Sequence, residues 1–444
     1  MKAAVRKATF RLIGASPNSA NVSTLRPANS RPAVSSALPA VALFALCTTA
    51  TLTISVGDNE IKRILALGQM LLGVLALGLP LGRFPLPGKP VFVLLFSVAA
   101  WGWGQLALGG TVYRYATKVA AIHWVSGLAV LFIAAVALRP TALRRQFLLA
   151  FAWFGFAVGV AGVLTNLTSP DRILWVFPSA YPDTWGPFLS RNDFAMLLEL
   201  SFPVAFWATG MGAASEKALP VWVPAAMLAA GLASASRAGA ALLVVEAVVL
   251  LAPVLPGSFL SNKRTGRRSG FRARAAPAAF LFMVLMAASL AGTGTLWGRL
   301  QAPDPFQFRR QIAASAMAMI AERPFQGFGL GTFAEVYPAY ATIDIGAVVE
   351  HAHNDWLEWA AEGGLPFALL WLLLGIRLAI PAIRSGWGIG LVALFLHALV
   401  DYPFAKFGLT AWTFALAGML QAQGERTPSP NALTIQTQHK EIFL

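Results

Sequence analysis

The sequence predicts an all-α protein: a polytopic integral membrane bundle of about twelve transmembrane helices, with a long outer loop that contains short helices. Hydrophobic residues make up 57% of the 444-residue chain and charged residues only 12%, whereas soluble domains carry about 25% charged residues. Apolar runs of about 20 residues, long enough to cross a bilayer as helix, recur from Leu38 almost to the C-terminus. Unpaired backbone groups are too costly in lipid for most other structures, so a helical bundle follows.

Twelve apolar runs are the expected spans. They cover residues 38–56, 64–82, 90–108, 117–138, 147–167, 192–210, 219–235, 238–256, 277–297, 365–383, 387–402 and 408–424. Only Ser236 and Arg237 separate the seventh span from the eighth, which predicts a tight helical hairpin. We expect one membrane domain over residues 37–424.

Two polar tails flank this domain. Residues 1–36 are rich in Ala, Ser, Pro and Arg and contain no acid. This composition predicts a disordered basic tail, with a transit peptide as the alternative. Residues 425–444 are expected to form a second tail.

The basic residues predict the orientation. A net charge of +15 could indicate nucleic-acid binding, but the charges lie in short clusters between apolar runs, as topology signals do. With the N-terminus inside, 21 of the 34 basic residues fall on cytoplasmic segments. The block 262–274 alone carries six basic residues and no acid. Both termini are therefore expected in the cytoplasm.

Two long polar intervals then fall on the outer face, at residues 168–191 and 298–364. Trp175 and Trp185 suggest that the first is an ordered loop at the level of the lipid headgroups. In the second, apolar residues at helical spacing predict a helix over 309–323, with a shared face of Ile312, Ala316, Met319 and Ile320. A second helix is expected over 352–362, closed by Gly363 and Gly364.

The second interval also holds the densest group of polar side chains. His353 is the first candidate for a catalytic base, because an imidazole titrates close to neutral pH. A loop histidine that is merely hydrogen-bonded at the membrane surface is the alternative. Asn354 and Asp355 are placed to orient His353 or a bound hydroxyl. A helix would align four titratable residues on one face, namely His351, Asp355, Glu358 and Glu362. For Glu358 a solvated acidic stripe is the simpler interpretation.

A metal site is the competing interpretation of this segment. His-x-His-x-Asp offers three ligands, but a zinc site would need more from elsewhere. The other histidines, at positions 123, 397 and 439, lie in spans or in the C-terminal tail, and Cys47 lies inside the first apolar run. We therefore expect no metal and no other cofactor.

Arginines on the outer side form the second group of candidates. Arg191 precedes the sixth span, Arg237 lies between the seventh and eighth spans, and Arg309 and Arg310 begin the loop helix. Arginine grips phosphate oxygens with paired donors, so several of them near one histidine would form a diphosphate pocket. Side chains that extend toward the headgroups are the simpler alternative.

Acids within the spans are the third group, because ionisable residues in lipid are costly and usually functional or paired. Asp401 lies near the outer end of the eleventh span and could support the site. Glu199 and Glu246 lie deeper, and for Glu246 we expect a partner on a neighbouring helix.

These motifs, in their order along the chain, resemble the bacterial O-antigen ligase and polymerase superfamily. The segments are Arg191-Asn-Asp-Phe, Ser234-Ala-Ser-Arg237, Arg309 through Phe333, His351-Ala-His-Asn-Asp355, and His397-Ala-Leu-Val-Asp401-Tyr-Pro403. Together they extend from residue 191 to residue 403. The first five spans match no motif of the family.

The resemblance implies a fold of about twelve helices with a periplasmic loop over the site, in the bacterial inner membrane. It implies transfer of a glycan, without a metal, from a polyprenyl diphosphate carrier to a hydroxyl of a glycan, lipid A core or protein acceptor. His353 would be the base, and Arg191, Arg237 and Arg309 or Arg310 would hold the diphosphate.

Two other functions remain open from the residues alone. A transporter of an anionic or lipid-linked substrate could use the same arginines, but transporters place their sites near the bilayer midplane and often contain inverted repeats. Here the polar cluster lies outside the spans and no repeat stands out. A structural assembly protein would leave the histidine motif unexplained. A membrane glycan transferase is the preferred hypothesis.

Overall fold

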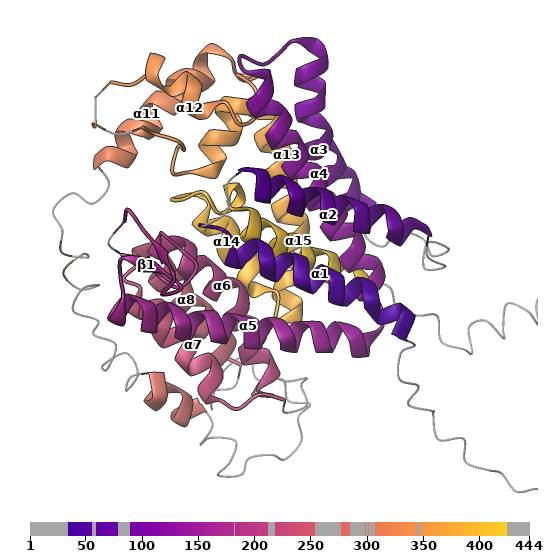
Figure 1. The fold of residues 1–444 in the computed structure, drawn as a ribbon, viewed down its shortest axis with the longest axis vertical. Coiled ribbons are helices and arrows are strands. Elements are labelled where there is room, and N and C mark those ends of the chain that lie inside the picture. The colour runs from indigo at the N-terminus through magenta and orange to yellow at the C-terminus, as the bar shows by residue number, and fades with distance from the viewer. Residues whose placement is uncertain are drawn as a thin grey trace, which may run out of the picture.

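The computed structural model describes residues 34–55, 59–78, 89–181, 183–211, 218–253, 277–284, 307–342 and 348–423, with residues 298, 301 and 346. Over these residues the chain is a bundle of helices with a smaller helical layer at one end (Figure 1). A short antiparallel hairpin, β1 (Arg172–Ile173) and β2 (Phe177–Pro178), is its one small sheet within the described residues. The all-α prediction is confirmed for this part of the chain.

The bundle helices follow the predicted apolar runs closely. They are α1 (Val34–Leu52), α2 (Asn59–Gly78), α3 (Lys89–Leu108), α4 (Arg114–Ala137), α5 (Thr141–Thr168), α6 (Arg191–Ala208), α7 (Trp222–Ala233), α8 (Arg237–Leu251), α13 (Asp355–Ser385), α14 (Ile389–His397) and α15 (Phe407–Gln423). The predicted hairpin of the seventh and eighth spans is confirmed, because α7 packs against α8 across a three-residue connection. Of the ninth predicted span only residues 277–284 are described, and they are helical. The C-terminal tail from residue 425 lies outside the described residues.

Three predicted boundaries were wrong. Helix α1 begins at Val34, inside the tail expected over 1–36, because polar residues before the apolar run continue the helix. Helix α13 begins at Asp355 rather than at residue 352, since the Asn354 side chain accepts the backbone N–H of Leu357 and caps the helix there. The glycine stop predicted for its first part is confirmed, because the non-helical backbone of Gly364 (φ 78°, ψ 169°) separates that part from the long helix beyond. The expected span 387–402 is the shorter α14, followed by a turn and the 3-10 helix η3 (Pro403–Ala405).

Helices α4 and α6 are the centres of two packed groups. Helix α4 packs against α1, α2, α3 and α15, whereas α6 packs against α5, α7, α8 and α14. Helix α13 contacts both α3 and α14 and so lies between the groups (Figure 1). The start of α6, the start of α13 and the end of α14 are thereby brought together.

Four helices, α3, α4, α5 and α13, are long and apolar enough to cross a membrane, judged by length and composition over the described residues. Shorter apolar helices lie at 37–52, 222–233 and 407–422. Large apolar side chains such as Leu71, Phe96 and Ile376 are exposed on the bundle surface, as expected of a surface that faces lipid. The count of twelve spans stays a prediction.

The outer layer has a small core of its own. It is built by α11 (Gln307–Glu322), α12 (Phe333–Val336) and the 3-10 helix η2 (Tyr337–Ala339), which rest on the start of α13. The face predicted for the first of these helices is confirmed, because Ile312, Ala316, Met319 and Ile320 are all buried in this core. The layer therefore packs as a unit over one end of the bundle.

Glu362 joins the outer layer to the bundle. Its carboxylate accepts the backbone N–H groups of Gly331 (2.8 Å) and Phe333 (2.9 Å), and its carbonyl accepts that of Gly329 (2.9 Å). Gly329 has φ +113°, and a Cβ there would lie 2.2 Å from the Thr111 hydroxyl, so only glycine fits. Glu362 is thus an internal anchor and not part of an exposed acidic face.

Candidate active site

The turn between α14 and η3 is the meeting point of four chain segments. It is closed by the His397 carbonyl, which accepts the N–H groups of Val400 (2.9 Å) and Asp401 (3.0 Å). Helix α13 begins against it: the Asp355 N–H is shared between the carbonyls of Ala398 (2.9 Å) and Asp401 (3.2 Å). The Asp355 carboxylate accepts the Phe404 N–H at 3.0 Å. Asp355 is buried and ties two segments together, which fixes where the preceding residues lie.

Asp401 is the centre of the polar cluster at this turn. Its Oδ2 accepts from Arg309 of α11 (3.3 Å) and from the Asn192 amide of α6, and its Oδ1 accepts the Tyr402 N–H (3.1 Å). Burial alone would raise the pKa of Asp401, but the His353 imidazole and the Arg309 guanidinium outweigh it and lower the pKa to about 2. Asp401 is therefore an anion at any physiological pH.

His353 lies next to this anion. Its Nδ1 is 3.5 Å from Asp401 Oδ1, within ion-pair range but too long for a well-formed hydrogen bond. That nitrogen is buried without a hydrogen-bond partner among the described residues, although the side chain is 35% exposed. The backbone of His353 is left-handed (φ 52°), a conformation that costs about 1 kcal/mol or more outside glycine and often marks functional sites.

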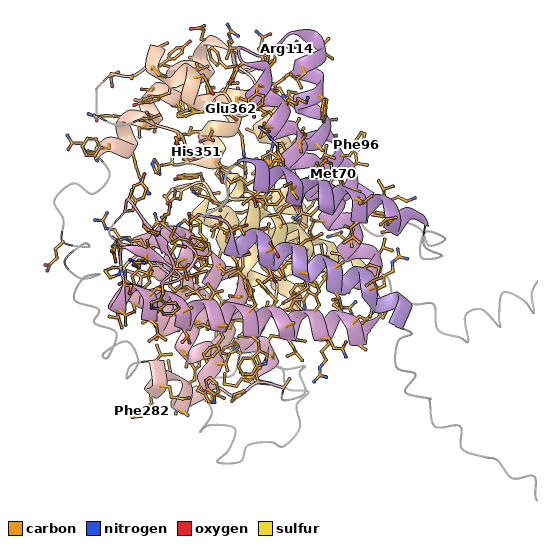
Figure 2. All side chains as sticks on the ribbon, viewed as in Figure 1. Met70, Phe96, Arg114, Phe282, His351 and Glu362 are labelled. Carbon is orange, nitrogen blue, oxygen red and sulfur yellow. The ribbon has the colours of Figure 1, made fainter. Side chains whose placement is uncertain are left out.

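His351, two residues earlier, is held more firmly. Its Nδ1 lies 2.8 Å from Glu358 Oε1, and Glu358 Oε2 accepts the Ala352 N–H at 2.7 Å. Burial would lower the pKa of His351, but the Glu358 carboxylate raises it above the ordinary value. Two expectations were therefore wrong: His351 precedes α13 instead of sharing its face, and Glu358 is a buried partner instead of a solvated acid. Figure 2 shows His351 where the outer layer meets the bundle.

Tyr402 separates the two histidines and was missed in the sequence. Its ring stacks on His351 (centroids 4.3 Å apart) and meets His353 edge to face (5.1 Å). Lys406 Nζ lies over the same ring at 4.6 Å and 3.3 Å from Asp193 of α6. Burial raises the pKa of Tyr402 to about 12, so the phenol stays neutral. The motif letters Asn192-Asp193 and Tyr402 were visible, but nothing in one sequence assigns them a contact.

The predicted arginines occupy different places. Arg309 donates to both Asp401 and the Val400 carbonyl, whereas Arg310 beside it is exposed on α11. Arg191 lies next to Asn192 at the start of α6, and its guanidinium pairs with Asp183 of the preceding loop. Arg237 begins α8, whose Gly239 packs against Ala195 of α6 so closely that a Cβ would lie 2.4 Å from it. The helix starts that carry Arg191 and Arg237 are therefore neighbours.

The side chains that could bind a metal ion, and the acids buried in the bundle, occupy separate places. Asn354 uses its side-chain oxygen to cap α13, and the two loop histidines face different carboxylates. In the described part of the chain, His, Cys, Asp and Glu side chains form no group of three that could hold a metal ion. Glu199 pairs with His397 (2.7 Å). The expected helix partner of Glu246 was wrong: within the described residues neither of its buried oxygens has a hydrogen-bond partner.

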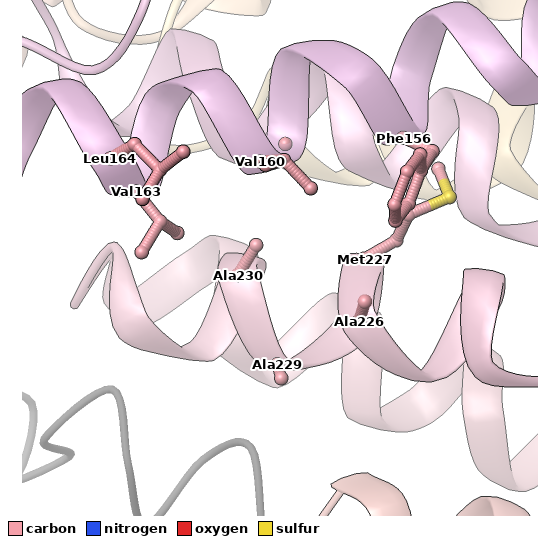
Figure 3. A pocket seen from close by; sticks show the side chains of 9 residues that line it. Phe156, Val160, Val163, Leu164, Ala226, Met227, Ala229 and Ala230 are labelled. Carbon is pink, nitrogen blue, oxygen red and sulfur yellow. The ribbon is translucent and has the colours of Figure 1, made fainter.

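An apolar groove of about 190 Å³ lies elsewhere, between α5 and α7 (Figure 3). Phe156, Val160, Leu164, Met227 and Ala230 are among its lining residues. None of the side chains around Asp401 lines it, so it is not part of the polar cluster.

The chemistry of the cluster is that of an imidazole held beside a carboxylate, with a guanidinium close by. Such a set can accept a proton and stabilise an anionic group at the same place.

Part of the chain matches a known protein family. Residues 223–372 match the family model described as O-antigen ligase. The match includes Arg237, Arg309 and His353 but is narrower than the stretch from residue 191 to residue 403 that carried the resemblance. No curated protein matches the chain.

Proposed function

We propose, from the match of residues 223–372 to the O-antigen ligase family model, that this integral membrane enzyme transfers a glycan from a polyprenyl diphosphate carrier to an acceptor hydroxyl. The observation that carries the proposal is the convergence of His353, Asp401 and Arg309 at one turn. These residues come from three separate segments, and only the fold brings them together. The transport alternative places its site at the membrane midplane, whereas this cluster lies where α6 and α13 begin and α14 ends.

In the proposed reaction His353 is the general base. The acceptor hydroxyl attacks the anomeric carbon of the donor sugar, its proton passes to the imidazole, and the bond from that carbon to the diphosphate oxygen breaks. Asp401 holds the ring and stabilises the imidazolium that forms, as an orienting carboxylate does in other base-assisted reactions. Such a base contributes about 10²–10⁴-fold to the rate.

The leaving diphosphate gains negative charge as the bond breaks. Arg309, whose side chain is 31% exposed beside Asp401, is the first cation placed to receive it. Arg191, Arg237 and Arg310 are proposed to complete the anion site from the starts of α6, α8 and α11. Guanidinium groups held in advance stabilise developing charge without reorganisation. Asn354 and Asp355 act by setting the start of α13 and so the place of His353.

The site is proposed to face the periplasm of a bacterial inner membrane, with both termini cytoplasmic and residues 37–424 as the membrane domain. The donor is proposed to be undecaprenyl-diphosphate-linked, as in lipopolysaccharide assembly. The residues leave three acceptors possible: a lipid A core, the end of a growing polysaccharide, or a protein.

The decisive experiment is deletion of the gene, with complementation by the wild type and by His353→Ala. Surface glycans and lipid-linked precursors are then analysed. Single unpolymerised repeats identify a polymerase, unattached long chains a ligase, and unglycosylated protein a protein-modifying enzyme. Normal glycans in a strain that carries only stable, membrane-inserted His353→Ala would overturn the proposal.

A further inference from the structure

Glu199 and His397 form a buried, closely paired carboxyl and imidazole inside the bundle. Glu199 Oε1 of α6 lies 2.7 Å from His397 Nδ1 at the end of α14, and the side chains are 0% and 1% exposed. Burial of a carboxylate and an imidazole is costly even when they are paired, and apolar residues of similar size often serve stability as well or better. Such a pair is therefore expected to serve position more than stability.

The pair lies directly beneath the site. His397 and Asp401 are joined by the turn, since the His397 carbonyl accepts the Asp401 N–H at 3.0 Å. On α6, Asn192 and Glu199 are seven residues apart and share one helical face. Asn192 binds the Asp401 carboxylate, and Glu199 binds the His397 ring. Helix α6 thus holds the turn at both of its ends.

Close backbone packing makes this attachment rigid. Gly390 of α14 lies so near α6 that a Cβ on it would be 2.2 Å from the Glu199 carbonyl oxygen. The two helices therefore cannot slide past each other easily at this level. The direction of the His397 ring, and with it the end of α14, is then set by its bond to Glu199.

We propose that Glu199 and His397 are positioning residues that hold Asp401 within reach of His353 and Arg309. This inference rests on the proposed function, since it requires His353 to be the base. Neither residue touches a reacting atom. A displacement of about 1 Å at a catalytic group can lower a rate about 100-fold, so a buried anchor can control the rate from a distance.

The charged groups around the pair, together with His353, determine how the pH dependence of glycan transfer should change when the pair is altered. Asp193 and Glu199 of α6, Asp401 of the turn and Arg309 of α11 surround His397. Glu246 of α8 faces Glu199. If Asp401 moves away from His353, an imidazolium loses its counter-charge. The acid limb of the pH–rate profile, where the base becomes protonated and the rate falls, then moves to lower pH. This limb is called the base limb.

The test compares two replacements of His397 in membrane vesicles that contain the cell's own donor and acceptor. His397→Asn keeps a donor at the place of Nδ1, whereas His397→Leu removes it. We expect about tenfold or greater loss of kcat in the Leu variant with little change in KM, and a base limb at lower pH. The Asn variant should retain a rate within about threefold of the wild type and an unmoved limb.

Folding is controlled by a second variant. Glu199→Leu together with His397→Leu replaces both partners by apolar groups, which should leave stability nearly unchanged. This double variant should still show the same loss of kcat and the same shift of the base limb as His397→Leu. Glu246→Gln, a buried acid of the same bundle outside the pair, is expected to behave as wild type. Thermal unfolding in detergent measures the folded fraction of each variant.

The inference is overturned if the double Leu variant has wild-type kcat, or if the rate falls only in proportion to the folded fraction with the limb unmoved. It is also overturned if the Asn and Leu variants are equally impaired. His353→Ala in the same vesicles separates the two proposals. If this variant remains active, the proposed function fails. If it is inactive but the pair variants have wild-type rates, only the positioning role is rejected.

Discussion

His351 and His353 are separated by one residue but are held in different ways. His351 has an ordinary hydrogen bond of 2.8 Å to the buried Glu358 and a stacked tyrosine. His353 has a left-handed backbone, a looser contact of 3.5 Å to Asp401 and a more exposed side chain (35% against 28%). A firmly bonded histidine holds the loop in place, whereas a loosely bonded one can exchange a proton with a substrate. We therefore propose a structural role for His351 and a chemical role for His353.

The largest effect should come from replacing His353 by alanine, with the same replacement of His351 as the matched control. His353→Ala is expected to lower glycan transfer by about 10²–10⁴-fold, the usual contribution of a general base. His351→Ala should retain most of the activity, because its bond supports the loop from one side only. Transfer rates in membrane vesicles check this. Equal losses in the two variants would remove the distinction drawn here.

The next largest effect should come from Asp401→Asn, which keeps the size of the side chain and removes its charge. We expect about tenfold or greater loss of rate, because the imidazolium loses its counter-charge. The pKa of Asp401 is about 2, so the carboxylate is ionised throughout the working range. The carboxylate therefore adds no pH limb of its own, but the base limb should move to lower pH, so the loss should be smaller on the acid side of that limb than above it. Asp171→Asn, an exposed acid of the outer loop, is the matched control.

Arg309→Lys should have a smaller effect, of about tenfold on the apparent affinity for undecaprenyl diphosphate, because a lysine cannot make two parallel bonds to a phosphate. Arg310→Lys should change the affinity less, since the Arg310 side chain is exposed beside the cluster. Titration of both variants with that lipid in nanodiscs measures the difference. A stronger loss in the Arg310 variant would exchange the roles of the two residues.

The smallest effect concerns stability. The pKa of His351 is raised in the folded state by Glu358, so this pair stabilises fully below the ordinary histidine pKa, and its contribution is lost as the pH rises through the raised value. His351→Gln should be less stable than the wild type by about 1 kcal/mol at low pH. The gap should narrow at alkaline pH. Unfolding in detergent across a pH series checks it, and a gap that widens with pH would contradict the assignment.

Much of the fold was predictable because it follows from hydrophobicity. Apolar runs located the helices, and helical spacing located the buried face of α11, since neither depends on distant contacts. The start of α13 was missed because Asn354 caps it locally. The break at Gly364 was predicted correctly, because a glycine pair usually ends a helix. Here Phe325 lies so close to the backbone that only a glycine fits there.

The candidate site was predictable in type but not in its contacts. His353, Asp401 and Arg309 were chosen for their chemistry, and the fold places them together. The remaining candidates were chosen in the same way, yet Asn354 caps a helix and Arg191 pairs with Asp183. Asn192 and Tyr402 were not chosen, because an amide and a phenol gain meaning only from their neighbours.

The sequence by itself determined that the chain is a helical membrane protein, where most helices lie, and which residues are chemically able to move a proton or hold a phosphate. These properties depend on composition and on short-range periodicity. Only the tertiary structure decided which histidine is firmly hydrogen-bonded and which is not. It also decided that α6 holds the turn before η3 through both Asp401 and His397. Those facts depend on contacts between residues up to 209 positions apart in the chain, and the distances across such contacts are set by packing, which no local pattern encodes.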